Sequence, residues 1–290
     1  MSTARERFHK ILAGPGFVEA APVFDPLSAR IASMQGWEVC KLSGSVGKFA
    51  NLAMPDDVPM ANISDLVDLV WRINRVCESC LIVDADDGGG SALNVRRTVR
   101  ELEAAGATAI EIEDNIVPRR FGGTNRHGVM VSKNEHVGKL HAAIDARRDA
   151  QTVIVARSSA LNEMPRDDAM ERLHAYSATG AAAIMLPGLA HGKADIEAAM
   201  EATHLPLLLL GVPLDVLADK EFLEKARLRV RFLGNSPYAM AVKALDDCYR
   251  HLKAGGKVAD LADREAPKPL LREVDQTATM LQWQEKYMRD

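Results

Sequence analysis

Eight short apolar segments recur along the 290 residues of this chain at fairly even intervals. Most are separated by stretches in which apolar residues repeat at helical spacing, as in 92–105, where Gly106 then ends the pattern. Strands that alternate with helices favour parallel pairing, and eight strands are the number that closes a TIM-type barrel. The sequence therefore predicts an α/β protein with a (β/α)₈ barrel, and a doubly wound open sheet is the alternative. The expected strands cover residues 18–24, 38–42, 80–83, 107–113, 152–156, 182–186, 205–210 and 230–233.

The chain continues well beyond the eighth expected strand. A segment rich in Gly, Pro and charge at 254–269 is typical of a linker, and 270–290 shows a last helical pattern with Leu281 and Trp283 to bury. A helix outside a complete barrel needs a surface to cover, either its own barrel or a neighbouring subunit. We predict a single domain, with the barrel over 1–254 and a linker and extra C-terminal helix over 255–290. The other expected helices cover 26–35, 64–76, 92–105, 134–147, 166–179, 193–203 and 236–254.

The composition argues against several classes of partner. The formal net charge of −4 gives no electrostatic basis for binding nucleic acid or an anionic membrane. No segment approaches the roughly 20 apolar residues that span a bilayer. Four cysteines are too few for a disulfide framework in this length, and Cys77 and Cys80 lack the second ligand pair of a zinc site. We expect a cytoplasmic protein in which this pair consists of structural thiols.

Charged residues stand at the carboxyl ends of three expected strands. Side chains alternate across a strand, so Asp84 and Asp86 share one face of the third, while Glu113 and Arg157 lie at the ends of the fourth and fifth. Buried carboxylates are costly unless they are paired or bind a metal, and an oxygen-only cluster suits Mg²⁺. A neighbouring arginine suits a substrate carboxylate or phosphate. Because strand ends converge in a barrel, these residues predict a metal and substrate site.

The stretch 87–91, DGGGS, follows directly on the third strand. Its glycines are compatible with a loop that cradles a phosphate, but no P-loop pattern accompanies them, and they serve equally to turn the chain from strand to helix. Asp87 or Ser91 is expected to cap the helix that follows. On the second strand, Ser43 and Ser45 share a face and flank Gly44.

Taken together, these motifs resemble those of the isocitrate lyase/phosphoenolpyruvate mutase superfamily over most of the chain. The resemblance implies a Mg²⁺-dependent barrel enzyme, with Mn²⁺ able to substitute, that acts on small 2-oxo acids through enolate-like intermediates. It also implies that the last helix is swapped between subunits, in a homotetramer built as a dimer of helix-swapped dimers. The matching stretches lie at 23–30, 43–45, 55–56, 83–86, 112–114, 137–139 and 154–157.

Within the superfamily the chain is most similar to the bacterial oxaloacetate decarboxylase branch. The resemblance implies that Asp84 holds Mg²⁺ with Asp86 and Glu113 around it. It also implies two catalytic residues, Arg157, which grips a substrate carboxylate, and Asp56, which matches a further active-site acid. Asparagine replaces the branch's histidine after the eighth strand, and it can donate a hydrogen bond but cannot carry a proton. The implied substrate-binding residues are Ser43, Gly44, Ser45, Arg157 and Asn235.

Departures from the family pattern bear on the substrate. The stretch 87–91 and the pair Ser158-Ser159 both differ from the usual residues, and the loop after Asp114 has no Lys-Lys-Cys-Gly-His, which argues against isocitrate cleavage. The resemblance implies decarboxylation of oxaloacetate to pyruvate and CO₂ through a metal-stabilised enolate. The alternatives are a phosphonopyruvate hydrolase or phosphoenolpyruvate mutase-like enzyme, a carbon–carbon lyase on a related 2-oxo or 2-hydroxy acid, and a ligand-binding member that has lost turnover.

Overall fold

The computed structural model describes residues 3–56, 62–117 and 129–289. The chain divides into two compact units, Met1–Asn235 and Ser236–Asp290, which are described separately below. Among the described residues, no helix combines the length and the apolar character needed to cross a membrane.

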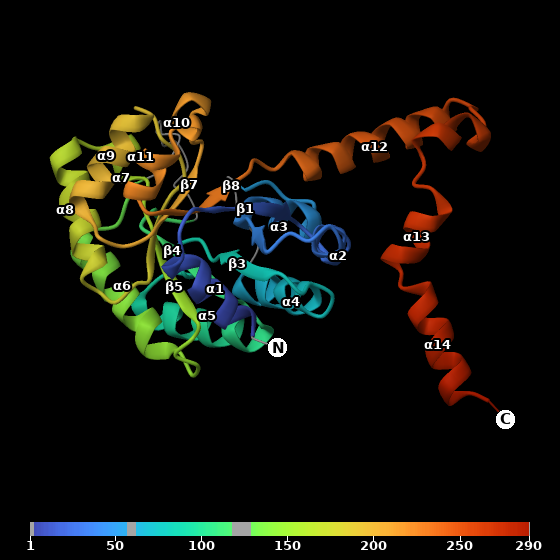
Figure 1. The fold of residues 1–290 in the computed structure, drawn as a ribbon, viewed down its shortest axis with the longest axis horizontal. Coiled ribbons are helices and arrows are strands. Elements are labelled where there is room, and N and C mark those ends of the chain that lie inside the picture. The colour runs from blue at the N-terminus through green and yellow to red at the C-terminus, as the bar shows by residue number, and fades with distance from the viewer. Residues whose placement is uncertain (1–2, 57–61, 118–128, 290) are drawn as a thin grey trace. The chain divides into compact units, whose positions relative to one another are not determined.

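The first unit contains a closed barrel of eight parallel strands, each paired with its neighbours in chain order (Figure 1). The first strand also pairs with the eighth, which closes the sheet and excludes the open-sheet alternative. The predicted fold class is therefore confirmed, and each expected strand agrees with the observed one to within two residues at each end. The strands are β1 (Val18–Val23), β2 (Val39–Leu42), β3 (Cys80–Asp84), β4 (Ala109–Glu113), β5 (Val153–Arg157), β6 (Ala183–Leu186), β7 (Leu207–Leu210) and β8 (Leu228–Phe232).

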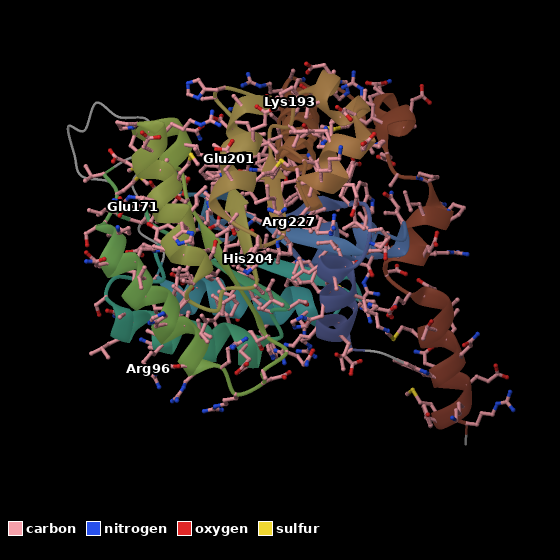
Figure 2. The ribbon with its side chains drawn as sticks, turned by 60° about the vertical axis from the view of Figure 1, so that its left-hand side comes forward. Arg96, Glu171, Lys193, Glu201, His204 and Arg227 are labelled. Carbon is pink, nitrogen blue, oxygen red and sulfur yellow. The ribbon has the colours of Figure 1, made fainter. Side chains whose placement is uncertain are left out.

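Helices surround the barrel and pack their apolar faces on the outward-facing residues of the strands. Their outer faces are charged, as Glu171, Lys193 and Glu201 illustrate in Figure 2. Four of these helices were not predicted, namely α3, α7, α10 and α11. The helices of this layer are α2 (Pro26–Met34), α3 (Gly44–Leu52), α4 (Ile63–Asn74), α5 (Ala92–Ala105), α6 (Lys133–Ala146), α7 (Ala160–Glu163), α8 (Arg166–Ser177), α9 (Lys193–Ala202), α10 (Leu214–Ala218) and α11 (Lys220–Lys225).

The N-terminal helix α1 (Ala4–Ala13) closes one end of the barrel interior. Its Phe8 and Leu12 are buried in the same apolar cluster as the first inward-facing residues of the strands. Cys80, which opens β3, donates its thiol hydrogen to the carbonyl of Ala4 at 3.2 Å. The amino ends of the strands are therefore sealed by apolar packing, and polar chemistry is confined to their carboxyl ends.

The second unit consists of helices on which few residues are buried. It contains α12 (Ser236–Lys253), the 3₁₀ helix η1 (Val258–Arg264), α13 (Lys268–Val274) and α14 (Thr277–Tyr287). The single helix expected over 270–290 is in fact two, because Gln276 adopts a left-handed conformation with φ of 58°. The helix expected over 236–254 is α12. It belongs to this second unit, whereas the sequence analysis placed it with the barrel. The predicted single domain with a swapped C-terminal helix stays a prediction.

Glu103, near the end of α5, fixes the turn that precedes β5, the strand that carries Arg157. Its buried carboxylate accepts hydrogen bonds from the backbone N–H groups of Arg148 and Asp149 at 2.9 and 3.0 Å. The hydroxyl of Thr152 donates a third at 2.6 Å. Burial tends to raise the pKa of Glu103, but these donors outweigh it and leave the pKa below its ordinary value.

Replacing Glu103 by Gln should lower the free energy of unfolding at pH 7 by about 1–3 kcal/mol, because charge-assisted hydrogen bonds are lost. The pKa of Glu103 is lower in the folded chain, so its contribution is present above the unfolded-state pKa of about 4.3 and is lost as pH falls through the folded value. Urea unfolding should therefore separate wild type from Glu103→Gln widely at pH 7 and only slightly near pH 3.

The exposed neighbour Glu101 provides the control, since Glu101→Gln should unfold like the wild type at both pH values. A Glu103→Gln cost that is equal at pH 7 and pH 3 would show that the charge of Glu103 is not what holds the turn.

Candidate active site

Strand register brings four charged side chains together at the carboxyl end of the barrel. Asp84 of β3 pairs with Glu111 of β4, and Glu113 of β4 pairs with Arg157 of β5. Each of the four has the same parity along its strand as an inward-facing apolar residue such as Ile82, so all four point into the barrel. The predicted convergence of these three strand ends is confirmed.

Arg157 lies at the centre of the cluster. Its Nη1 forms an ion pair and a hydrogen bond with the carboxylate of Asp84, and its Nε is 3.1 Å from Oε2 of Glu113. The same Nη1 is 3.9 Å from Oε2 of Glu111, whose other ion pair is with the buried Lys41. One guanidinium thus links three buried carboxylates that would otherwise repel one another.

The carboxylates around Arg157 differ in how well they are neutralised. Burial tends to raise the pKa of Asp84, but the charges of Arg157 and Lys41 outweigh it and hold that pKa well below its ordinary value. For Glu113, burial prevails over the charge of Arg157 and raises the pKa to about 7. Burial, with the charge of Asp84, likewise raises the pKa of Asp86 to about 6. The cations of the cluster therefore stabilise the charge of Asp84 better than that of Glu113 or Asp86.

Asp86 does not lie on the strand face where the sequence placed it, because β3 ends at Asp84. Asp86 has a left-handed backbone with φ of 50°, an uncommon conformation that aspartate tolerates better than most residues. Its N–H donates to Oδ1 of Asp84 at 3.2 Å, and its carboxylate is 2.9 Å from Nζ of Lys48. Gly44 permits this placement, since a Cβ there would lie 2.7 Å from Oδ1 of Asp86.

A small cavity of about 110 Å³ opens among these residues. Gly44 lines a second cavity next to it, and Asn235 lies exposed after β8, outside the lining of either. The substrate contact predicted for Asn235 stays a prediction. Most of the loop after Asp114, from 118 to 128, lies outside the described residues. The predicted residues that do line the small cavity are Ser43, Ser45, Asp56, Asp84, Asp86, Glu113 and Arg157.

Several residues of the site were not predicted from the sequence. Lys41 and Glu111 have the same parity as Ser43 and Glu113 on their strands, so the alternation that identified the strand ends also pointed to them. Lys48 gave no such signal, because it lies on α3, a helix that the sequence analysis did not predict. Two further polar residues line the cavity, Asn115 and Ser159, and the amide of the first donates to the hydroxyl of the second at 3.2 Å.

The glycine-rich stretch after Asp86 turns the chain. Gly88 has φ of 81°, and a Cβ there would lie 2.5 Å from Cγ2 of Val95, so only glycine fits. Ser91 occupies the N-cap of α5 as predicted. Asp87 does not cap that helix; it accepts from the N–H of Gly89 at 2.8 Å and lies 3.4 Å from Nζ of Lys139.

The cysteine pair is free of disulfides. Cys80 is buried on β3, and Cys77 has its Sγ 3.9 Å from that of Cys40 rather than near Cys80. This arrangement fits the expected structural role of these thiols.

The residues of the small cavity suit a hard divalent cation. Asp84, Asp86 and Glu113 contribute only carboxylate oxygens to it. Oε2 of Glu113 is buried and accepts no hydrogen bond from the described residues, although Nε of Arg157 lies 3.1 Å away. With Asp56 and Glu111 there are five carboxylates against Lys41, Lys48 and Arg157. When all five are ionised, the excess of two negative charges matches one divalent ion. Within the described parts of the chain, no three acidic, histidine or cysteine residues are already grouped as metal ligands.

Comparison with known proteins gives one consistent result. Residues 8–253 match the family model described as phosphoenolpyruvate phosphomutase. An oxaloacetate decarboxylase of Bradyrhizobium diazoefficiens is 37% identical over 277 residues, which cover 94% of both chains. Another from Rhodopseudomonas palustris strain BisB18 is 40% identical over 251 residues, covering 87% of this chain and 85% of that protein.

Solved structures agree with this match. A phosphonopyruvate hydrolase in complex with oxalate and Mg²⁺ superposes with a TM-score of 0.84 at 25% identity, over 99% of this chain and 100% of the other. A 2,3-dimethylmalate lyase described as a member of the PEP mutase/isocitrate lyase superfamily has a TM-score of 0.83 at 23% identity and covers 99% of both chains. With the family model and the decarboxylase relatives, these matches confirm the expected resemblance: the chain belongs to the phosphoenolpyruvate phosphomutase family, as an oxaloacetate decarboxylase-like member of its superfamily.

Proposed function

We propose that this protein is a Mg²⁺-dependent carboxy-lyase that converts oxaloacetate to pyruvate and CO₂. The observation that carries the proposal is the gathering of Asp84, Asp86, Glu113 and Arg157 around one cavity of about 110 Å³, a volume suited to a small dicarboxylate. Its relatives support the choice of reaction, since the two decarboxylases above are 37% and 40% identical to it.

Asp84, Asp86 and Glu113 would hold the metal, and Mn²⁺ would serve in its place. The phosphonopyruvate hydrolase that shares this fold was solved with Mg²⁺ and oxalate, a small dicarboxylate, and this supports the same pairing here. When bound, a divalent cation supplies electrophilic stabilisation of negative charge that develops on the substrate. The two negative charges in excess when the carboxylates of the cluster are ionised favour such an ion over a neutral ligand.

Arg157 would hold a substrate carboxylate. Its Nη1 and Nε face the acids of the cluster, and a planar guanidinium has further donors that suit a carboxylate. Ser43 and Ser45, whose hydroxyl oxygens are 3.0 Å apart, line the same cavity at the start of α3. The N–H groups at that helix terminus add a partial positive charge that favours an anionic substrate.

In the proposed reaction the bond from C3 to the departing carboxylate breaks, and CO₂ leaves. The electron pair moves toward the oxygen at C2, and C3 then takes a proton from solvent to give pyruvate. Asp56 has the most exposed side chain of the acids that line the cavity, at 37%, against 28% for Asp86. We therefore assign Asp56 to relaying the solvent proton toward C3.

A second candidate is hydrolysis of phosphonopyruvate. The solved phosphonopyruvate hydrolase supports it with a match over the whole fold at 25% identity. The two reactions give different second products, since one releases CO₂ and the other phosphate. A member that only binds its ligand would release neither.

Purified protein with Mg²⁺ should form pyruvate from oxaloacetate well above the rate of Mg²⁺ alone, and EDTA should abolish the difference. Arg157→Lys keeps the charge but loses the planar donor pair, so kcat/KM should fall about 10- to 100-fold. A matched change outside the site, Arg96→Lys on α5, should leave kcat/KM unchanged (Figure 2). Phosphate from phosphonopyruvate without CO₂ from oxaloacetate would favour the second candidate, and no product from either would contradict both.

We also propose that the C-terminal helices pair with a second subunit, as in a tetramer of helix-swapped dimers. The observation in support is that α12, α13 and α14 bury none of their residues within the described chain. Large apolar side chains are exposed along them, including Leu245, Leu281 and Trp283. Such surfaces are typical of subunit interfaces.

Introducing charge at these exposed apolar positions should therefore break the assembly. The double variant Leu281→Glu/Trp283→Glu should reduce the molecular mass measured by light scattering to that of a smaller oligomer or a monomer. Gln284→Glu adds one charge to the same helix and should leave the mass unchanged. A wild-type protein that is monomeric, or a double variant of unchanged mass, would contradict the proposed interface.

A further inference from the structure

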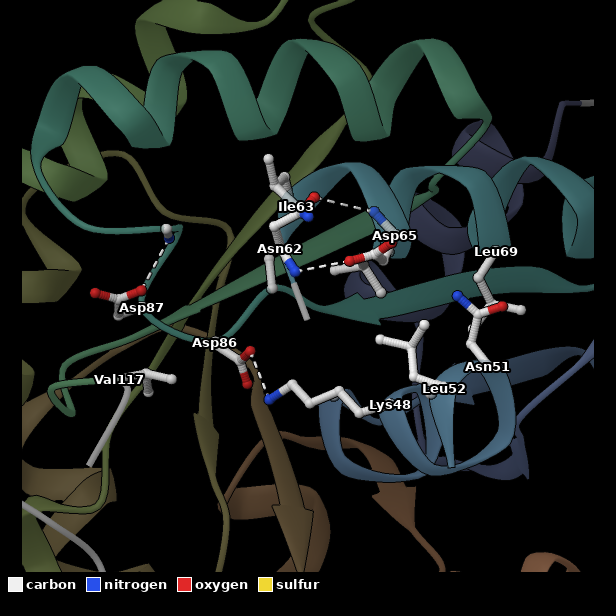
Figure 3. A pocket seen from close by; sticks show the side chains of 15 residues that line it. Lys48, Asn51, Leu52, Asn62, Ile63, Asp65, Leu69, Asp86, Asp87 and Val117 are labelled. Atoms are coloured by element: carbon white, nitrogen blue, oxygen red, sulfur yellow. Dashed lines mark hydrogen bonds and ion pairs between the residues drawn. The ribbon is translucent and has the colours of Figure 1, made fainter. Parts of the chain in front are cut away.

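Lys48 is a buried cation whose ammonium group lies between two acids of the candidate site. It is 8% exposed and stands on α3, one turn after Ser45. Its Nζ lies 2.9 Å from Oδ2 of Asp86 and 2.9 Å from Oδ1 of Asp56, and Figure 3 shows the contact with Asp86. Nothing in the reaction described above uses this side chain.

The contact with Lys48 is the one that holds the carboxylate of Asp86. The backbone of Asp86 is held by the hydrogen bond from its own N–H to Oδ1 of Asp84 and by one from the N–H of Glu113 to its carbonyl at 2.8 Å. Because the backbone of Asp86 is left-handed, its carboxylate is directed to Lys48 rather than along β3 toward Arg157. Lys48 thus neutralises the one proposed metal ligand that Arg157 does not contact in this structure.

We propose that Lys48 is a positioning residue that acts as a built-in counter-charge for Asp86 and Asp56, and that it limits how tightly the site binds a divalent cation. The inference rests on the metal site proposed above. It goes beyond that proposal because it assigns a role to a residue that neither the motifs nor the reaction identified.

The charges of the cluster give the physical reason. When all five carboxylates are ionised, the excess of two negative charges matches one divalent ion if Lys48 is present; without Lys48 the excess becomes three. A divalent cation that binds Asp86 has to share that carboxylate with the ammonium group of Lys48. The two positive charges then lie close together, and they repel each other strongly in a partly buried site. Without a metal, the same ammonium group lowers the cost of burying Asp86 among other carboxylates.

The effect of Lys48 on cation binding can be separated from its effect on stability by removing the charge while keeping the length of the side chain. Lys48→Met should bind Mn²⁺ at least about tenfold more tightly than wild type in calorimetry. Its melting temperature should be lower than that of wild type in EDTA, and its increase on adding Mg²⁺ should be larger. Lys225→Met, which removes an exposed lysine paired with Glu221, should change none of these three quantities.

A purely structural role for Lys48 predicts a different pattern. Lys48→Met would then melt at a lower temperature by the same amount with and without Mg²⁺, and it would bind Mn²⁺ no more tightly than wild type. That result would overturn the inference and leave the metal site intact. Absence of Mn²⁺ binding in both proteins would overturn the metal site and the inference together. If Lys48→Met does not fold, Lys48→Gln removes the same charge with a polar side chain and is judged by the same measurements.

Discussion

The ion pairs of Arg157 with Asp84 and Glu113 are the interaction on which the rest of the site depends. Charges buried at this depth are costly, and breaking a buried pair leaves an uncompensated charge. One guanidinium links carboxylates from β3 and β4, so three adjacent strands must keep their register for the site to exist. The barrel supplies that register through continuous hydrogen bonding between neighbouring strands.

Packing elsewhere in the first unit maintains this arrangement. Phe8 of α1 seals the amino end of the barrel with apolar contacts, so the interior is polar only near the carboxyl ends of the strands. Glu103 fixes the turn that leads into β5 and hence the position of Arg157. The acids remain in excess of the cations, and this imbalance is what a divalent cation would correct.

Eight apolar segments that alternate with helical patterns were enough to predict the barrel. Alternation of side chains along the strands then predicted the convergence of Asp84, Glu113 and Arg157, because a side chain on a strand points to one of only two faces. Asp86 was misplaced because its left-handed backbone depends on the turn beyond the strand. Lys48 was missed for a related reason: whether a lysine on a helix points to solvent or into the site depends on tertiary packing, which periodicity does not report. The pattern of residues alone predicted a metal and substrate site, and the family resemblance was needed to predict the reaction.

The central claim is that the acids at the barrel's carboxyl end bind a divalent cation together with a small dicarboxylate. A crystal structure of the protein with Mn²⁺ and oxalate, recorded with anomalous scattering from manganese, tests it most directly. The account predicts one strong manganese peak in the cavity lined by Asp84, Asp86 and Glu113, with oxalate beside it. An empty cavity, or manganese bound only at other positions, would contradict it.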